Sequence, residues 1–122
     1  MKCPVCGKYE FEEYDDYDIC PVCNWENDGL QYNDHNYAGG ANDLSVTEAR
    51  IEYFLLNFST TKKKAKELHD DYSKVLVSII HRYGSYDRVS EQEKAEQEIQ
   101  DYRNARKDYV DKLNELLLSI LS

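Results

Sequence analysis

The sequence predicts a mainly helical protein that begins with a small four-cysteine knuckle, and three observations support this fold class. Four cysteines form two C-x2-C pairs within the first 23 residues. Aromatic and acidic residues alternate between the pairs, which favours short strands. Apolar residues recur at helical spacing from residue 51 onward. We therefore expect a knuckle or ribbon with short strands, then one short helix, then a long antiparallel helical hairpin.

The expected division places the knuckle and the first helix in residues 1–58 and the hairpin in residues 59–122. A chain of 122 residues is long enough for one compact domain or for one domain with a small appendage. We expect the hairpin to pack on the knuckle, and one continuous domain is the alternative.

The four cysteines are the candidate metal ligands: Cys3, Cys6, Cys20 and Cys23. Four thiolates suit one tetrahedral Zn²⁺ and leave no position for water or substrate, so we expect one structural zinc per chain. Each pair lies in a Cys-Pro-Val-Cys turn, and the following residues, Gly7 and Asn24, suit a positive φ. No export signal is recognisable, which argues against disulfides. A single iron, as in rubredoxin-like proteins, is the alternative metal.

The segment between the cysteine pairs is acidic and rich in tyrosine. Residues 8–19 are predicted to form a hairpin or loop with short strands, because Tyr9 and Phe11 alternate with acids. Since tyrosine is enriched at protein interfaces, this segment is the candidate partner-binding surface. A solvated face without a partner is the simpler interpretation of the same run. The candidate residues are Glu12, Glu13, Tyr14, Asp15, Asp16 and Tyr17.

Residues 24–44 are predicted to form a long ordered loop, because Asn, Asp and Gly dominate them. One interpretation makes Trp25, Asp28 and residues 39–42 a ligand pocket beside the metal. We favour the other, in which Trp25 covers the knuckle and the two glycines let the loop cross it closely. Arg50 is then expected to pair with Glu26 or Asp28.

Helix-start signals and apolar stripes place three helices in the remainder. A capping box at Ser45 and Glu48 opens a helix with an apolar face of Ile51, Phe54, Leu55 and Phe58. A second helix is expected over residues 62–83, ended by Gly84. A second capping box, at Ser90 and Glu93, opens a third helix that reaches Leu121.

The third helix is longer than the second, so we expect its leucine-rich end to extend beyond the second helix. The first helix would cover these leucines in a monomer. A second copy of the chain would cover them in a homodimer formed through the third helix. The sequence leaves both states open.

The formal net charge is −9, and it is unevenly distributed. Residues 1–44 carry 2 Lys and 10 Asp or Glu, which gives −8, and residues 45–122 carry the remaining −1. An acidic knuckle repels phosphate backbones, so direct nucleic-acid binding is not expected. No apolar run reaches the roughly 18 residues that a membrane span needs, so we do not expect a membrane protein. Because no export signal is recognisable, we expect a cytoplasmic location.

No set of residues predicts catalysis. His35, His69 and His81 lack partners at the spacing of a catalytic or ligand motif, and solvated or boundary positions explain them. We therefore do not expect an enzyme.

The N-terminal motifs resemble the bacterial cysteine-rich CPCC family. The resemblance covers about the first 50 residues. It is carried by Cys3-Pro4-Val5-Cys6-Gly7, by Ile19-Cys20-Pro21-Val22-Cys23 followed by Trp25-Glu26 and Asp28, by Gly39-Gly40-Ala41-Asn42, and by Ser45 with Glu48-Ala49-Arg50. The chain has Val5 where the family name implies a third cysteine. The resemblance implies a small zinc-knuckle protein and carries no settled activity.

Three functions fit these features. The first is a non-catalytic protein-binding module, with an immunity or inhibitor protein as its most specific form and a partner that the sequence does not name. The second is an acidic mimic that occupies the nucleic-acid site of another protein. The third is a rubredoxin-like iron electron carrier.

Overall fold

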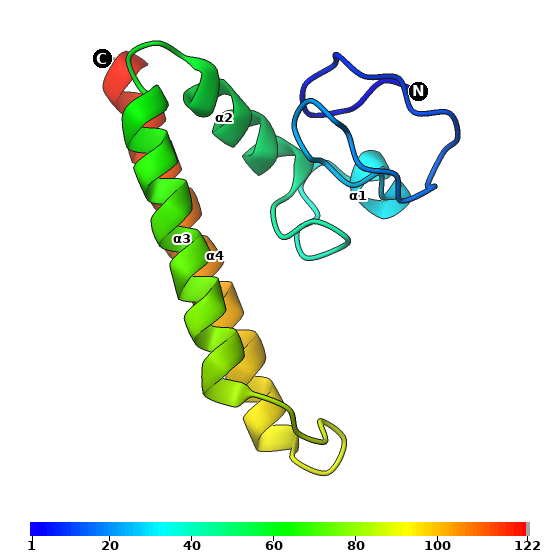
Figure 1. Cartoon of the computed structure of the whole chain (residues 1–122), viewed down its shortest axis with the longest axis vertical. Coiled ribbons are helices and arrows are strands. Elements are labelled where there is room, and N and C mark those ends of the chain that lie inside the picture. Colours follow the sequence, from blue (N-terminus) through cyan, green and yellow to red (C-terminus); the bar gives the residue numbers. More distant parts are fainter. Residues whose placement is uncertain (122) are drawn as a thin grey trace. The chain divides into compact units, whose positions relative to one another are not determined.

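The computed structural model describes residues 1–121, which belong to two compact units, Met1–Thr60 and Thr61–Ser122. The first unit contains α1 (Gly29–Asn33) and α2 (Val46–Asn57), and the second contains α3 (Lys62–Tyr83) and α4 (Gln92–Leu121) (Figure 1). The predicted mainly helical fold with an N-terminal four-cysteine cluster is confirmed. Within residues 1–121, no helix combines the length and the apolar character needed to cross a membrane.

The predicted short strands are reduced to two isolated bridges in the described residues. Lys2 pairs with Glu10 across the first cysteine turn, and Ile19 pairs with Glu26 across the second. No strand joins the two bridges because Asp15 and Tyr17 have φ values of 58° and 57°, which an extended strand does not accept. The cysteine turns, rather than strand ladders, therefore organise this part of the chain.

The predicted loop over residues 24–44 contains a helix that the sequence analysis missed. Asp28 is the N-cap of the five-residue α1, and its carboxylate accepts hydrogen bonds from the N–H groups of Leu30 and Gln31. Asp28 followed three residues later by Gln31 is the available start signal. The surrounding Asn and Gly residues obscured it.

Helix α2 starts as predicted. Ser45 Oγ accepts from Glu48 N at 3.1 Å, and Glu48 Oε1 accepts from Ser45 N at 2.9 Å, which completes the capping box. The predicted apolar face is only partly buried. Leu55 is fully buried. The rings of Phe54 and Phe58 stack with their centroids 5.0 Å apart and remain partly exposed.

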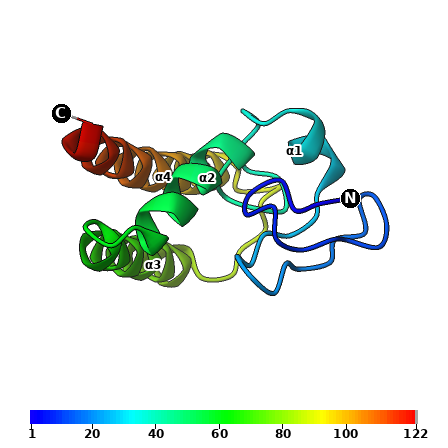
Figure 2. The ribbon, with the colours of Figure 1, turned by 90° about the horizontal axis from the view of Figure 1, so that it is seen from above.

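Helices α3 and α4 form the predicted antiparallel hairpin, as Figures 1 and 2 show. The rings of Tyr72 and Tyr109 stack with their centroids 4.4 Å apart, and Tyr83 donates a hydrogen bond to Asp101. This register places the C-terminal end of α4 beside the first turns of α3. The expected leucine overhang is therefore wrong, because the extra length of α4 lies at its N-terminal end.

The loop between α3 and α4 covers that extra length. Glu98 is buried, and its carboxylate accepts from Tyr86 Oη at 2.7 Å and from Arg88 Nε at 3.1 Å. Gly84, with φ 59°, ends α3 as predicted. The predicted capping box at Ser90 is wrong, because Ser90 Oγ donates to Asp87 O at 3.4 Å and α4 starts at Gln92.

Candidate metal centre

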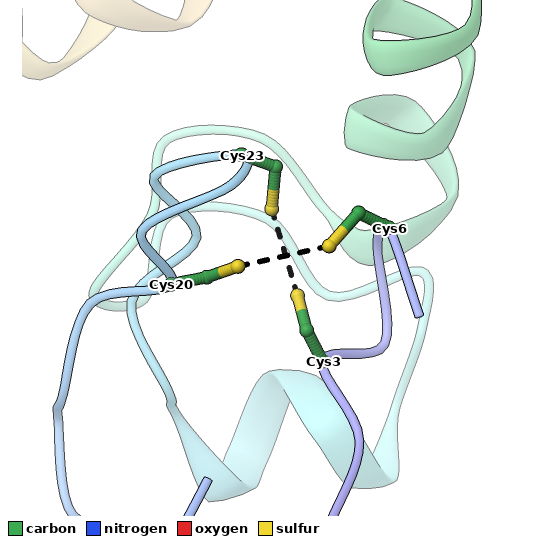
Figure 3. A group of neighbouring side chains, drawn as sticks. All are labelled: Cys3, Cys6, Cys20 and Cys23. Carbon is green, nitrogen blue, oxygen red and sulfur yellow. Dashed lines mark hydrogen bonds between the residues drawn. The ribbon is translucent and has the colours of Figure 1, made fainter. Parts of the chain in front are cut away.

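The four cysteine sulfurs lie at one point of the first unit. Their Sγ atoms all lie within 4.8 Å of one another, with Cys3 and Cys23 at 3.5 Å and Cys6 and Cys20 at 3.6 Å. Figure 3 shows the four side chains converging from two loops on a common centre. A disulfide needs a sulfur separation of about 2.05 Å, so these distances describe four free thiols.

The two cysteine turns have matching backbones. Gly7 N donates to Cys3 O at 3.0 Å, and Asn24 N donates to Cys20 O at 2.8 Å. Gly7 and Asn24 both have φ 67°, as predicted. The left-handed residue reverses the chain directly after the second cysteine of each pair. Two copies of one local structure therefore present two sulfurs each.

The electrostatics of the cluster favour a bound cation. Burial raises the pKa of the Cys3 thiol, and burial likewise raises the pKa of Cys23. Burial also opposes ionisation of Cys20, but N–H groups of Cys23 and Val22 donate to its sulfur and hold its pKa below the ordinary value. The raised pKa values of Cys3 and Cys23 disfavour their thiolates, and a divalent cation at the sulfurs would supply the positive charge that stabilises them.

The residues fit one tetrahedral ion. Zn–S bonds of about 2.3 Å in a tetrahedron separate the sulfurs by about 3.8 Å. The sulfur separations of Cys3 from Cys23 and of Cys6 from Cys20, 3.5 and 3.6 Å, need only a small expansion to reach that value. The cluster therefore suits one metal ion, held by Cys3, Cys6, Cys20 and Cys23, that would join the two turns.

The family comparison agrees with this geometry. The family model described as cysteine-rich CPCC matches residues 1–71, which is more than half of the chain. The chain belongs to the cysteine-rich CPCC family. The match includes both cysteine turns and α2, and it extends past the predicted 50 residues into α3. No curated protein matches the sequence.

The Gly-Gly-Ala-Asn run of this CPCC domain is fastened against α1. Gln31 is fully buried, and its Nε2 donates to the carbonyl oxygens of Tyr37, Asn42 and Leu44 at 3.0 to 3.2 Å. Asp28 Oδ2 accepts from Ala41 N at 2.8 Å. These contacts give Asp28 and Asn42 partners within the protein, which the ligand-pocket interpretation did not expect.

Gly40 is required by this close crossing. A Cβ atom at residue 40 would lie 2.5 Å from Asp28 Oδ2, so no larger residue fits without displacing that carboxylate. Trp25 is buried, as the favoured interpretation expects. The expected pairing of Arg50 with Glu26 or Asp28 is wrong. Arg50 Nε instead donates to Pro4 O in the first cysteine turn at 2.6 Å.

The predicted partner-binding residues divide into two groups. Tyr14, Asp15 and Asp16 hold the segment against the rest of the unit. Tyr14 Oη donates to Gly29 O at 3.3 Å, Asp15 Oδ1 accepts from Gly29 N at 2.7 Å, and Asp16 Oδ1 accepts from Asn27 Nδ2 at 2.8 Å. The Asn27 amide holds the pKa of Asp16 below its usual range.

The second group faces solvent. Glu12, Glu13 and Tyr17 are exposed, and Tyr14 combines its hydrogen bond with an exposed ring. Gln31 and Asn27 also organise this site, and neither was among the predicted site residues. Both lie in the predicted loop, and only Gln31 had a signal, its position three residues after Asp28.

Proposed function

We propose that this protein is a non-catalytic protein-binding module that presents an acidic, tyrosine-rich surface on a unit held by one structural zinc. The observation that carries the proposal is the exposed ring of Tyr17, which stands on a backbone with φ 57°. A bulky residue rarely occupies that region, and such strain persists where the surroundings fix it and often where a function uses it.

The proposed binding surface consists of Glu12, Glu13, Tyr14 and Tyr17. Tyr14 and Tyr17 are each 55% exposed. Tyrosine contributes a large rigid contact area, and the adjacent carboxylates select a partner with a basic surface. Residues 1–60 contain 12 Asp or Glu and three basic side chains, Lys2, Lys8 and Arg50, so the formal net charge of this unit is −9. That field would also accelerate the encounter with a basic partner.

The proposed zinc fixes this surface through the second cysteine turn. Tyr17 N donates to Asn27 O at 3.0 Å, and Asn27 N donates to Asp18 O at 2.8 Å. The bridge between Ile19 and Glu26 then leads directly into Cys20. A metal at the four sulfurs therefore restrains both ends of the segment that bears Tyr17. Four thiolates leave no open coordination position, which supports a structural role and no turnover.

The experiment compares two tyrosine variants. Tyr17→Gly removes the ring and also relieves the backbone, because glycine accepts a positive φ at no cost. Tyr37→Ala removes another exposed tyrosine ring from the same unit and serves as the matched control. Proteins captured by each zinc-loaded full-length variant are compared by mass spectrometry.

We expect a basic protein that wild type and Tyr37→Ala capture and that Tyr17→Gly and the double variant Glu12→Gln, Glu13→Gln lose. Equal capture by all four proteins would contradict the proposal. If the protein is an immunity or inhibitor protein, it would also inhibit the activity of the captured protein.

An acidic nucleic-acid mimic is the second candidate function, and the concentration of −9 in the first unit favours it. It predicts that double-stranded DNA displaces the captured partner and that the complex is steeply salt-sensitive. An iron electron carrier predicts a coloured protein with a reversible reduction, which elemental analysis and absorbance would show.

A further inference from the structure

A depression adjoins the first cysteine turn. It has a volume of about 380 Å³, and Lys2, Tyr32, His35 and Arg50 line it together with residues 3–7, which include the metal-ligand candidates Cys3 and Cys6. Cys20 and Cys23 do not line it, so it borders the four-sulfur cluster without being the space between the sulfurs. Its volume lies within the range of small-molecule sites.

The charge of the depression is opposite to that of its surroundings. The first unit contains Lys2, Lys8 and Arg50 as its basic side chains, and two of the three line this one feature. No Asp or Glu lines it, and its acidic groups are the thiols of Cys3 and Cys6, whose charge a bound metal would partly neutralise. Across residues 1–121, the structure shows no ion pair for Lys2 or for the terminal guanidinium nitrogens of Arg50. In a unit with 12 acids, this segregation of unpaired cations indicates a site for an anion.

The backbone holds the basic groups in place. Arg50 Nε donates to Pro4 O, which leaves the two terminal nitrogens available for a forked contact. Thr47 N donates to His35 O at 3.0 Å, and the His35 ring lies edge-on to Tyr32 with centroids 6.5 Å apart. An imidazole offers a ring N–H in either protonation state.

We propose that this depression binds the phosphate group of a small phosphorylated ligand. A phosphate dianion balances the two positive charges of Lys2 and Arg50, and its several oxygens match donors that approach from different sides. A carboxylate carries one charge and two oxygens, so it fits this set less well. The surrounding negative charge disfavours a long polyanion such as nucleic acid and favours a compact ligand.

The test titrates inorganic phosphate into the metal-loaded full-length protein and follows backbone amide resonances at constant ionic strength. We expect shifts at Lys2, His35 and Arg50 that saturate, and about tenfold weaker binding in Lys2→Ala and in Arg50→Gln. Lys8→Ala is the matched control. Lys8 is the third basic side chain of the unit and lies over the Tyr53 ring at 5.6 Å.

Three outcomes would overturn the proposal. Equal weakening by Lys8→Ala and Lys2→Ala would show diffuse attraction, and tighter binding of acetate than of phosphate would assign the site to a carboxylate. Absence of any saturable shift, with faster metal release from both variants, would show that Lys2 and Arg50 only offset the thiolate charge. Because Arg50 also contacts the cysteine turn, Lys2→Ala decides the result if Arg50→Gln loses its metal.

Discussion

Different interactions stabilise the interior of each of the two units. In the hairpin, long helices pack along their length and bury residues such as Leu113 and Ile79. In the cysteine unit, short helices and loops are joined by sulfur clustering and by buried polar side chains such as Gln31. Regular periodic structure therefore needs little beyond apolar burial, whereas an irregular unit needs specific cross-links.

The largest expected effect is the loss of the cysteine unit when its metal is removed. Metal binding in small zinc domains contributes about 10–16 kcal/mol, which is more than a small domain otherwise holds. We expect Cys20→Ser, or a strong chelator, to collapse the amide dispersion of residues 1–60 in a heteronuclear NMR spectrum. Simultaneous loss of the α3 and α4 resonances would contradict the comparison between the two units.

The next effect belongs to the hairpin. Leu113 is 1% exposed, so Leu113→Ala removes buried methyl groups and should lower the free energy of unfolding by about 2–5 kcal/mol. Urea unfolding followed by circular dichroism measures this change. Leu118→Ala is the control, because Leu118 lies on the same helix but is exposed. An equal loss in both variants would show that burial in the hairpin does not decide its stability.

A third prediction distinguishes the contribution of the Gln31 hydrogen bonds from that of the metal. Gln31→Ala leaves the carbonyl oxygens of Tyr37, Asn42 and Leu44, the last of them in a buried contact, without the Gln31 donor and should cost about 2–4 kcal/mol of unfolding free energy in the first unit. We expect faster proteolysis at residues 37–44 with one metal still bound. Leu30→Ala, on the exposed side of α1, should change neither. Metal loss in Gln31→Ala would contradict this separation, because it would show that metal binding depends on the hydrogen bonds of Gln31.

The smallest expected effect is a decrease in the stability of the hairpin at acidic pH. Hydrogen bonds from Tyr83 and Gln97, with Arg82 nearby, hold the pKa of Asp101 below its usual range. A depressed folded pKa adds stability that is present above the unfolded value of about 3.9 and is lost as the pH falls through the folded value. We expect Asp101→Asn to flatten this part of the pH profile, read from α3 and α4 resonances. An unchanged profile would exclude the contribution of Asp101.

The local features of this chain were predictable from its sequence. The cysteine spacing gave the sulfur cluster, Gly7 and Asn24 gave the two reversals, and Ser45 with Glu48 gave the start of α2. The two reversals and the helix start depend on residues that are close together in the chain. The sulfur cluster joins cysteines up to 20 residues apart, and it was predictable because two matched cysteine pairs suit one metal ion. Short-range geometry is enough to specify such structures.

The remaining features depend on which chain segments cross. Gln31 reaches carbonyl oxygens up to 13 residues away, and Arg50 reaches Pro4 across 46 residues. The buried Glu98 is paired by a loop 10 residues earlier. A polar side chain in a loop has many possible partners, and only the folded path selects one. The register of the hairpin has the same origin, because the loop between α3 and α4 decides at which end the longer helix extends.

We infer that one metal ion at Cys3, Cys6, Cys20 and Cys23 organises the first unit. Native mass spectrometry with elemental analysis, on protein purified without added metal, tests it most directly. We expect one zinc per chain and a well-dispersed spectrum for residues 1–60. A metal-free chain that keeps that dispersed spectrum would contradict the claim, and one iron with visible absorbance would replace the structural zinc with a redox centre.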